Sequence, residues 1–199
     1  MCKTLAAAVI LHNWFTLIHM KILKDEIAYD GKYVQIINRH YTDNDGQERV
    51  WELVKRKVFG RIIVVVPVTA ERELILEKIY RVALGRDVLE LPAGLMDREG
   101  ESEEEVVRRE LLEETGYSVD KIELLTVGPA DPGLSVHEIA IYLGTNARKV
   151  QDPSPGDSEV IEVIKVPIDR VMQYLSENAG KIMLDIKIAA VIPLLSNRL

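Results

Sequence analysis

The segment that decides the fold covers residues 102–117 and reads SEEEVVRRELLEETGY. Its first four residues, Ser102–Glu105, form a capping-box pattern, in which the serine and the glutamate three positions later bond each other's backbone N–H groups. Apolar residues follow at positions 106, 107, 111 and 112, which is helical spacing, and Gly116 is a typical helix stop. The sequence therefore predicts one helix from Ser102 to Thr115.

Carboxylates gather on this predicted helix. Between residues 97 and 114 the chain carries nine acids and three arginines, so this stretch supplies −6 of the formal charge of −7. Glu110 and Glu114 are four residues apart, which puts two like charges on one helix face. Glu113 adds to the crowding, and Arg109, four residues before it, can hold it by a charge-assisted bond. A solvated helix face is the ordinary explanation of such a run.

A bound divalent cation would remove the repulsion among these glutamates. Mg²⁺ prefers a few carboxylate oxygens and keeps water molecules for substrate phosphates, which suits two or three convergent glutamates. The pattern therefore indicates a Mg²⁺ site, with Mn²⁺ as the alternative metal.

Composition limits the partners and the setting. The chain has 199 residues, 47% of them hydrophobic, with 25 Lys and Arg against 32 Asp and Glu. An acidic chain is not expected to bind nucleic acid, because phosphate-backbone affinity comes from clustered cations. A single cysteine excludes a disulfide framework or a Cys-rich zinc site, and a reducing, cytoplasmic setting is expected. The apolar stretch near the N-terminus is broken by polar residues well short of the roughly 20 that a membrane span requires, so we expect no membrane partner.

Three parts are expected along the chain. Residues 1–20 form an extension to which we assign no role, residues 21–60 form a strand-rich β-unit, and residues 61–199 form the main domain. Strands are predicted at Ile62–Val68, Glu73–Tyr80, Lys121–Val127, His137–Leu143 and Val160–Val166, a loop at Leu91–Gly94, and helices at 168–175 and 185–195. Strands before and after a central helix predict an α/β (α+β) fold, a mixed sheet between helices.

The glutamate-rich segment resembles the Nudix box. That box reads Gly, five residues, Glu, seven residues, then Arg-Glu-apolar-any-Glu-Glu-any-Gly-apolar, and Gly94, Glu101 and the run Arg109–Tyr117 follow it. Six residues rather than five separate Gly94 from Glu101, which predicts a one-residue loop insertion near Asp97–Arg98. The resemblance covers nearly all of residues 21–199, and it implies a Nudix α/β/α sandwich with a small N-terminal β-domain.

The chain is most similar to the ADP-ribose and ADP-sugar pyrophosphatases of the Nudix family. Leu91–Gly94 resembles the LPAG segment of that subfamily, Asp131–Ser135 its DPGLS loop, Pro155–Val163 its PGD loop, and Arg49–Arg56 its N-terminal tryptophan strand. The resemblance implies Mg²⁺-dependent hydrolysis of ADP-ribose to AMP and ribose 5-phosphate. It also implies a homodimer, in which residues 21–56 of one chain complete the site of the other.

The resemblance further implies roles for individual residues. The metal ligands would be the Ala93 carbonyl, Glu110, Glu114 and Glu159. The proton acceptor would be Glu159 first and Glu113 second, with Arg109 orienting the glutamates. The substrate contacts would be Tyr33 and Trp51 on the base, Arg56 and Arg81 on the phosphates, and Asp131 and Leu134 near the terminal ribose.

Each substrate contact also has an ordinary structural explanation. Trp51 suits simple strand packing, the two arginines suit surface cations, and Asp131 suits a turn. Glu159 equally fits a solvated loop acid, although a Pro- and Gly-rich loop suits a group that must swing onto substrate. The four histidines, His12, His19, His40 and His137, show no ligand spacing and are expected to be non-catalytic.

Two other functions stay open. A Nudix enzyme for another nucleotide sugar, a dinucleoside polyphosphate or an oxidised nucleotide would keep the box and change the loops, and the DPGLS-like segment and Trp51 favour an ADP-sugar. A non-catalytic nucleotide sensor of the same fold would be expected to lack glutamates of the box, whereas this chain retains them all.

Overall fold

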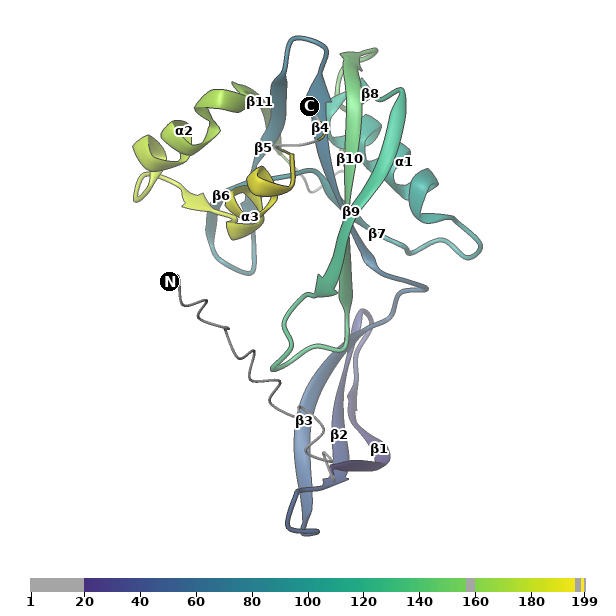
Figure 1. The fold of residues 1–199 in the computed structure, drawn as a ribbon. Coiled ribbons are helices and arrows are strands. Elements are labelled where there is room, and N and C mark those ends of the chain that lie inside the picture. The colour runs from purple at the N-terminus through teal and green to yellow at the C-terminus, as the bar shows by residue number, and fades with distance from the viewer. Residues whose placement is uncertain (1–19, 157–159, 196–197, 199) are drawn as a thin grey trace, which may run out of the picture. The chain divides into compact units, whose positions relative to one another are not determined.

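The computed structural model describes residues 20–156, 160–195 and 198. The chain divides into two compact units, residues 1–55 and residues 56–199. The first unit contains a three-stranded sheet in the order β1-β2-β3 (Figure 1), made of β1 (Lys21–Asp30), β2 (Val34–Thr42) and β3 (Glu48–Arg56), of which the last residue, Arg56, belongs to the second unit. Strands β1 and β2 pair antiparallel. Asp43 shapes the turn before β3, because its carboxylate accepts hydrogen bonds from the backbone N–H groups of Asp45 (3.0 Å) and Gln47 (2.9 Å).

This small sheet leaves much of its apolar surface uncovered. Ile37 and Leu53 are buried, whereas Ile27, Val50 and Trp51 are each more than half exposed. The small sheet of the first unit therefore presents apolar side chains to solvent.

The second unit is built on a nine-stranded mixed sheet. Its central strands run β12-β6-β5-β4-β10-β8, with β11 paired to β5, β7 to β4 and β9 to β10. The strands are β4 (Ile62–Thr69), β5 (Glu73–Arg81), β6 (Arg86–Glu90), β7 (Ala93–Leu95), β8 (Tyr117–Ser118), β9 (Lys121–Pro129), β10 (Glu138–Lys149), β11 (Ile161–Pro167) and β12 (Met183–Leu184). The helices are α1 (Glu103–Thr115), the 3₁₀ turn η1 (Ile168–Arg170), α2 (Val171–Asn178) and α3 (Ile186–Leu195). Strands β4 and β10 pair in parallel, while β5 is antiparallel to β4, β6 and β11.

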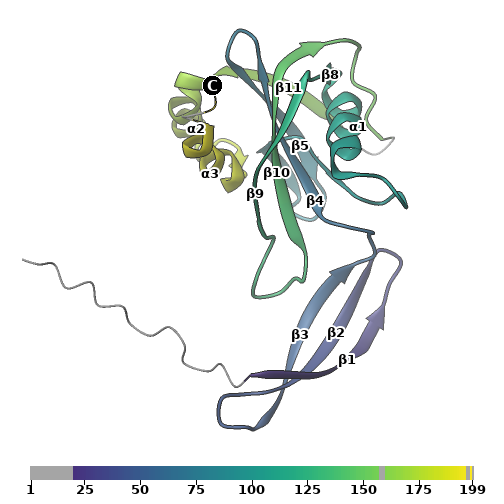
Figure 2. The ribbon, with the colours of Figure 1, turned by 45° about the vertical axis from the view of Figure 1, so that its right-hand side comes forward.

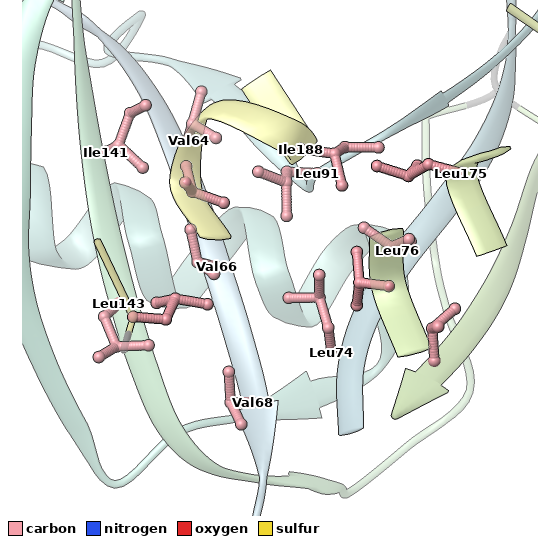
Figure 3. Close-up of a cluster of buried hydrophobic side chains, with 14 of the residues drawn as sticks. Val64, Val66, Val68, Leu74, Leu76, Leu91, Ile141, Leu143, Leu175 and Ile188 are labelled. Atoms are coloured by element: carbon pink, nitrogen blue, oxygen red, sulfur yellow. The ribbon is translucent and has the colours of Figure 1, made fainter. Parts of the chain in front are cut away.

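Helices cover both faces of this sheet, with α1 on one side and α2 and α3 on the other (Figure 2). Strand β4 supplies both cores. Val64 and Val66 face the cluster under α2 and α3 (Figure 3), and Ile63 and Val65 face the cluster under α1. A strand buried on both faces is apolar throughout rather than alternating, which is why the run from residue 62 to residue 68 has no polar position. The predicted α/β sandwich with a mixed sheet is confirmed.

Helix α1 begins and ends where the sequence predicts. The Ser102 hydroxyl accepts from the Glu105 N–H, and the Glu105 carboxylate accepts from the Ser102 N–H (2.8 Å), so the capping box is complete. Gly116 ends the helix in the left-handed region at φ 76°, and a Cβ there would collide with the carbonyl oxygen of Gln151. No helix in the described part of the chain is long and apolar enough to cross a membrane.

Several short strands differ from the sequence-based expectation. The predicted loop at Leu91–Gly94 contains the start of β7, which pairs with β4 through Gly94 opposite Ile63. The main-chain N–H and C=O groups at that edge of β4 need hydrogen-bond partners, and residues 91–95 supply them. One such bond runs from the Val65 N–H to the Pro92 carbonyl (2.8 Å). Strands β6, β8 and β12 were not predicted because each is short and lacks a periodic apolar pattern.

Candidate active site

Helix α1 and strand β7 meet at Gly94. A Cβ built on this glycine would overlap the carboxyl group of Glu110, so only glycine permits the approach. The Glu110 side chain therefore lies directly against the backbone of β7, one residue after Ala93.

Glu114 lies on the same side of the helix, one turn further on. Its Oε2 accepts a hydrogen bond from the Ala93 backbone N–H (3.1 Å), and the residue is only 5% exposed. The structure thus brings together Ala93, Glu110 and Glu114, the three described residues that the sequence assigns to the metal.

Arg109 joins this centre to the first glutamate of the box. Its Nε and Nη2 donate to the two oxygens of Glu101 (2.7 and 3.0 Å), and its Nη1 donates to Glu110 (2.7 Å). The bidentate pair holds the pKa of Glu101 below its usual range. The extra residue between Gly94 and Glu101 therefore lies in the loop and does not remove Glu101 from Arg109.

Two opposing effects act on Glu110. Burial raises the pKa of its carboxyl above the ordinary value, while the charge and hydrogen bond of Arg109 act to lower it and the nearby charge of Glu113 acts to raise it. A partly desolvated carboxylate of this kind favours a bound cation, because a cation neutralises the buried charge.

Glu113 is held more loosely than the sequence suggests. Arg109 Nη1 lies 3.4 Å from its Oε2 and Arg98 Nη2 lies 3.7 Å from its Oε1, while its side chain stays 41% exposed. The strongest bonds of Arg109 go to Glu101 and Glu110. The arginine therefore orients Glu110, a candidate metal ligand, more firmly than Glu113, the second candidate for the base.

Arg81 belongs to a charged group that the sequence did not reveal. Its Nε and Nη2 donate to the two oxygens of Glu90 (2.7 and 2.9 Å), and the charges of Glu77 and Glu114 also raise the pKa of the guanidinium. Glu90 is 8% exposed and Glu77 is fully buried. The available signal was a glutamate that directly follows a buried apolar run, Glu77 after residues 74–76 of β5 and Glu90 after residues 88–89 of β6.

The other predicted substrate contacts of the second unit lie on its surface. Arg56 is exposed, and its guanidinium has no ion pair within the described residues. Asp131 is exposed in a turn in which its carbonyl accepts from the N–H groups of Leu134 (3.1 Å) and Ser135 (2.7 Å). Leu134 is 49% exposed, so this turn presents a side chain to solvent.

Tyr33 and Trp51 lie in the first unit. Tyr33 falls in the connection between β1 and β2 and not in the strand, with the Lys32 ammonium 4.9 Å from its ring centre. Trp51 lies on β3 and is 51% exposed. Both rings are accessible, although both belong to a different unit from the glutamate cluster.

Glu159 lies outside the described residues. Within the described ranges 20–156, 160–195 and 198, no group of three or more His, Cys, Asp or Glu side chains is arranged to hold a metal. The candidate ligands are two carboxylates and one main-chain carbonyl. That set fits Mg²⁺, which binds through few carboxylates and keeps several waters, and it does not fit a closed structural site.

A mixed sheet lies between helices, and a helix rich in glutamate packs against Gly94 of strand β7; this is the arrangement expected of a Nudix hydrolase. The NUDIX domain family matches residues 58–186. The chain therefore belongs to the Nudix family.

Known proteins resemble this chain over most of its length. The ADP-sugar pyrophosphatase of Mus musculus is 35% identical over 167 residues, which cover 77% of this chain and 76% of that protein. The ADP-ribose pyrophosphatase of Bacillus subtilis (strain 168) is 27% identical over 156 residues, which cover 78% of this chain and 82% of that protein. A crystal structure of an ADP compounds hydrolase shares the fold, with a TM-score of 0.73, 21% identity, and coverage of 89% of this chain and 92% of that one. The predicted family, fold and enzyme class are confirmed.

Proposed function

We propose that this Nudix hydrolase cleaves the diphosphate linkage of ADP-ribose or a related ADP-sugar, yielding AMP and a sugar phosphate. One observation carries the proposal: Glu110 and Glu114 converge on the backbone of Ala93 and Gly94. The names of the mouse and Bacillus relatives support the nucleotide-sugar substrate.

The residues that would hold Mg²⁺, or Mn²⁺ in its place, are the Ala93 carbonyl, Glu110 and Glu114, joined by Glu159. When bound, the metal neutralises diphosphate charge and lowers the pKa of water. Arg109 would orient Glu110 through its bond to that carboxylate, and its charge acts to lower the pKa that burial raises. The Ala93 N–H fixes Glu114 in the same way.

A carboxylate would accept the proton of the attacking water, with Glu159 the first candidate and Glu113 the second. The exposure of Glu113 suits proton exchange with solvent, and its loose contacts with Arg98 and Arg109 leave it able to turn. A positioned general base contributes roughly 10²–10⁴-fold to the rate.

Substrate binding would use the exposed residues described above together with the half-buried Arg81. Arg56 and Arg81 would offset the diphosphate charge, and the turn of Asp131 and Leu134 would meet the sugar. Tyr33 and Trp51 would stack on the base, a contact that tolerates related purines.

The assembly would be a homodimer in which residues 21–56 of one chain complete the partner's site. Ile27, Val50 and Trp51 are exposed on a three-stranded sheet that buries little of its own, which supports an interface there. The single cysteine supports a cytoplasmic setting, and the acidic balance argues against nucleic acid as a partner.

A panel assay tests the proposal against its alternatives. The chain is incubated with Mg²⁺ and ADP-ribose, ADP-glucose, GDP-mannose, a diadenosine polyphosphate or nucleoside triphosphates, and the products are identified. We expect AMP and ribose 5-phosphate from ADP-ribose as the fastest reaction. Faster turnover of another nucleotide would assign a different Nudix substrate, and binding without turnover of any of them would indicate a nucleotide sensor.

A further inference from the structure

His137 joins two segments that carry candidate substrate contacts. Its Nε2 accepts a hydrogen bond from the Arg56 backbone N–H, with the two nitrogens 2.5 Å apart, and the residue is only 9% exposed. An acceptor at Nε2 requires a lone pair there, so the ring is the neutral tautomer with its proton on Nδ1. The imidazole thus fixes the backbone from which the Arg56 side chain extends.

The main chain of His137 closes the neighbouring turn. Its carbonyl accepts from the Ala130 N–H (2.8 Å), and its N–H donates to the Ser135 hydroxyl (3.2 Å). Ser135 in turn donates its N–H to the Asp131 carbonyl (2.7 Å). One residue therefore fixes the ends of the turn of Asp131 and Leu134 and also the position of Arg56.

The segment after Arg56 is tied to the candidate metal centre. The Phe59 N–H donates to the Met96 carbonyl (2.8 Å), and Met96 directly follows strand β7, which begins at Ala93. Arg61 pairs with Glu103 at 2.9 Å and with Glu138 at 2.7 Å. The segment from residue 56 to residue 61 is held by two backbone hydrogen bonds, at Arg56 and Phe59, and by the side-chain ion pairs of Arg61. The Arg56 guanidinium has no ion pair within the described residues.

A fixed backbone that carries a cation without an ion pair among the described residues is the arrangement expected of a preorganised anion contact. We propose that His137 is a positioning residue for diphosphate binding, which acts by holding the Arg56 main chain through Nε2. This inference rests on the proposed function only in taking a nucleotide diphosphate as the ligand. It does not depend on which sugar or base that nucleotide carries, or on whether the Arg56 guanidinium reaches the diphosphate in the site of its own chain or in that of the partner, because the bond to His137 lies within one chain.

Two substitutions separate this role from ordinary packing. His137→Leu keeps much of the side-chain volume and removes the acceptor, and it should raise KM about tenfold while kcat changes less than about threefold. His137→Gln offers an amide oxygen near the position of Nε2, and it should restore most of the lost affinity. Val171→Ala is the stability control, because this fully buried residue lies in the core under α2 and α3, and its loss should lower the unfolding temperature without raising KM.

A double-mutant cycle tests the route through Arg56. Arg56→Met should raise KM by itself. Adding His137→Leu should then have little further effect, because the methionine at residue 56 makes no phosphate contact that His137 could support. Additive effects, an unchanged KM in His137→Leu, or no rescue by His137→Gln would each overturn the proposal. An unchanged KM in Arg56→Met would overturn it as well.

The same series distinguishes failure of the inference from failure of the proposed function. The variants are assayed with the nucleotide that the wild-type protein hydrolyses fastest, so a substrate other than an ADP-sugar would refute the proposed function alone. ADP-ribose affinity is also measured by calorimetry without Mg²⁺, where no turnover is expected. A wild-type chain that neither hydrolyses nor binds any nucleotide of the panel would refute both.

Discussion

Glu110 occupies the space that any side chain at residue 94 would need, because a Cβ on Gly94 would overlap the Glu110 carboxyl group. This relationship explains why a glycine that lies 16 positions before Glu110 in the sequence belongs to the same site. The close approach also brings the carboxylate to Ala93, whose N–H is bonded to Glu114.

Gly94→Ala should therefore displace Glu110 while leaving most of the fold intact. A shift of about 1 Å at a catalytic group costs on the order of 10²-fold in rate, and we expect a loss of that size in kcat at saturating Mg²⁺. Gly128→Ala is the matched control, since a Cβ there meets no atom within 4 Å. Equal rates for the two variants would show that the Gly94 contact does not set the site.

Glu90→Gln should weaken the hold on Arg81. The variant loses the charge of the bidentate pair, while the charges of Glu77 and Glu114 remain near the guanidinium. The free energy of unfolding should fall by about 1 kcal/mol, and KM should rise because Arg81 is less well oriented toward phosphate. Chemical denaturation and steady-state kinetics measure the two effects, and an unchanged KM would remove Arg81 from the substrate contacts.

Glu101→Gln should change how stability depends on pH. The folded-state pKa of Glu101 lies below the ordinary carboxyl value. Its ionised carboxylate therefore contributes fully to the free energy of unfolding at any pH above that ordinary value. The contribution is lost as pH falls through the depressed folded-state pKa. Unfolding free energies of wild type and variant should therefore differ near pH 7 and converge in acid, and a constant difference from pH 7 to pH 3 would exclude the Arg109 pair as its source.

Mixing two inactive variants tests the shared site. A Trp51→Ala chain and a Glu110→Gln chain should each be nearly inactive, because the first loses the proposed contact with the base and the second a proposed metal ligand. In a mixed dimer with exchanged β-units, one site receives both lesions and the other receives neither, so activity should recover. No recovery after confirmed subunit exchange would place Trp51 and Glu110 of one chain in one site.

The sequence predicted the parts of the structure that obey local rules. Helix α1 follows from its capping box and its glycine stop, and the buried strand β4 follows from an unbroken apolar run. The contacts across the fold were less predictable. A charge-assisted i,i+4 bond between Arg109 and Glu113 was expected. The bidentate pair of Arg109 with Glu101, which no helical spacing describes, is the shorter contact.

Strand pairing accounts for the other differences. Residues 93–95 form strand β7 because they pair with the edge of β4, whereas the sequence alone indicated a loop there. The same sheet places Glu90 on β6 opposite Glu77 on β5, so the partner of Arg81 depends on strand register and not on its neighbours along the chain.

The most direct test of the whole account is Mg²⁺-dependent hydrolysis of ADP-ribose by the wild-type chain and by Glu110→Gln and Glu114→Gln. Each substitution removes one charge from the candidate metal site and relieves repulsion on α1, so both variants should unfold at or above the wild-type temperature. The wild-type chain should release AMP and ribose 5-phosphate, and each variant should be slower by at least about 10²-fold at saturating Mg²⁺. A folded Glu110→Gln or Glu114→Gln chain with near wild-type turnover would contradict the assignment of the metal site.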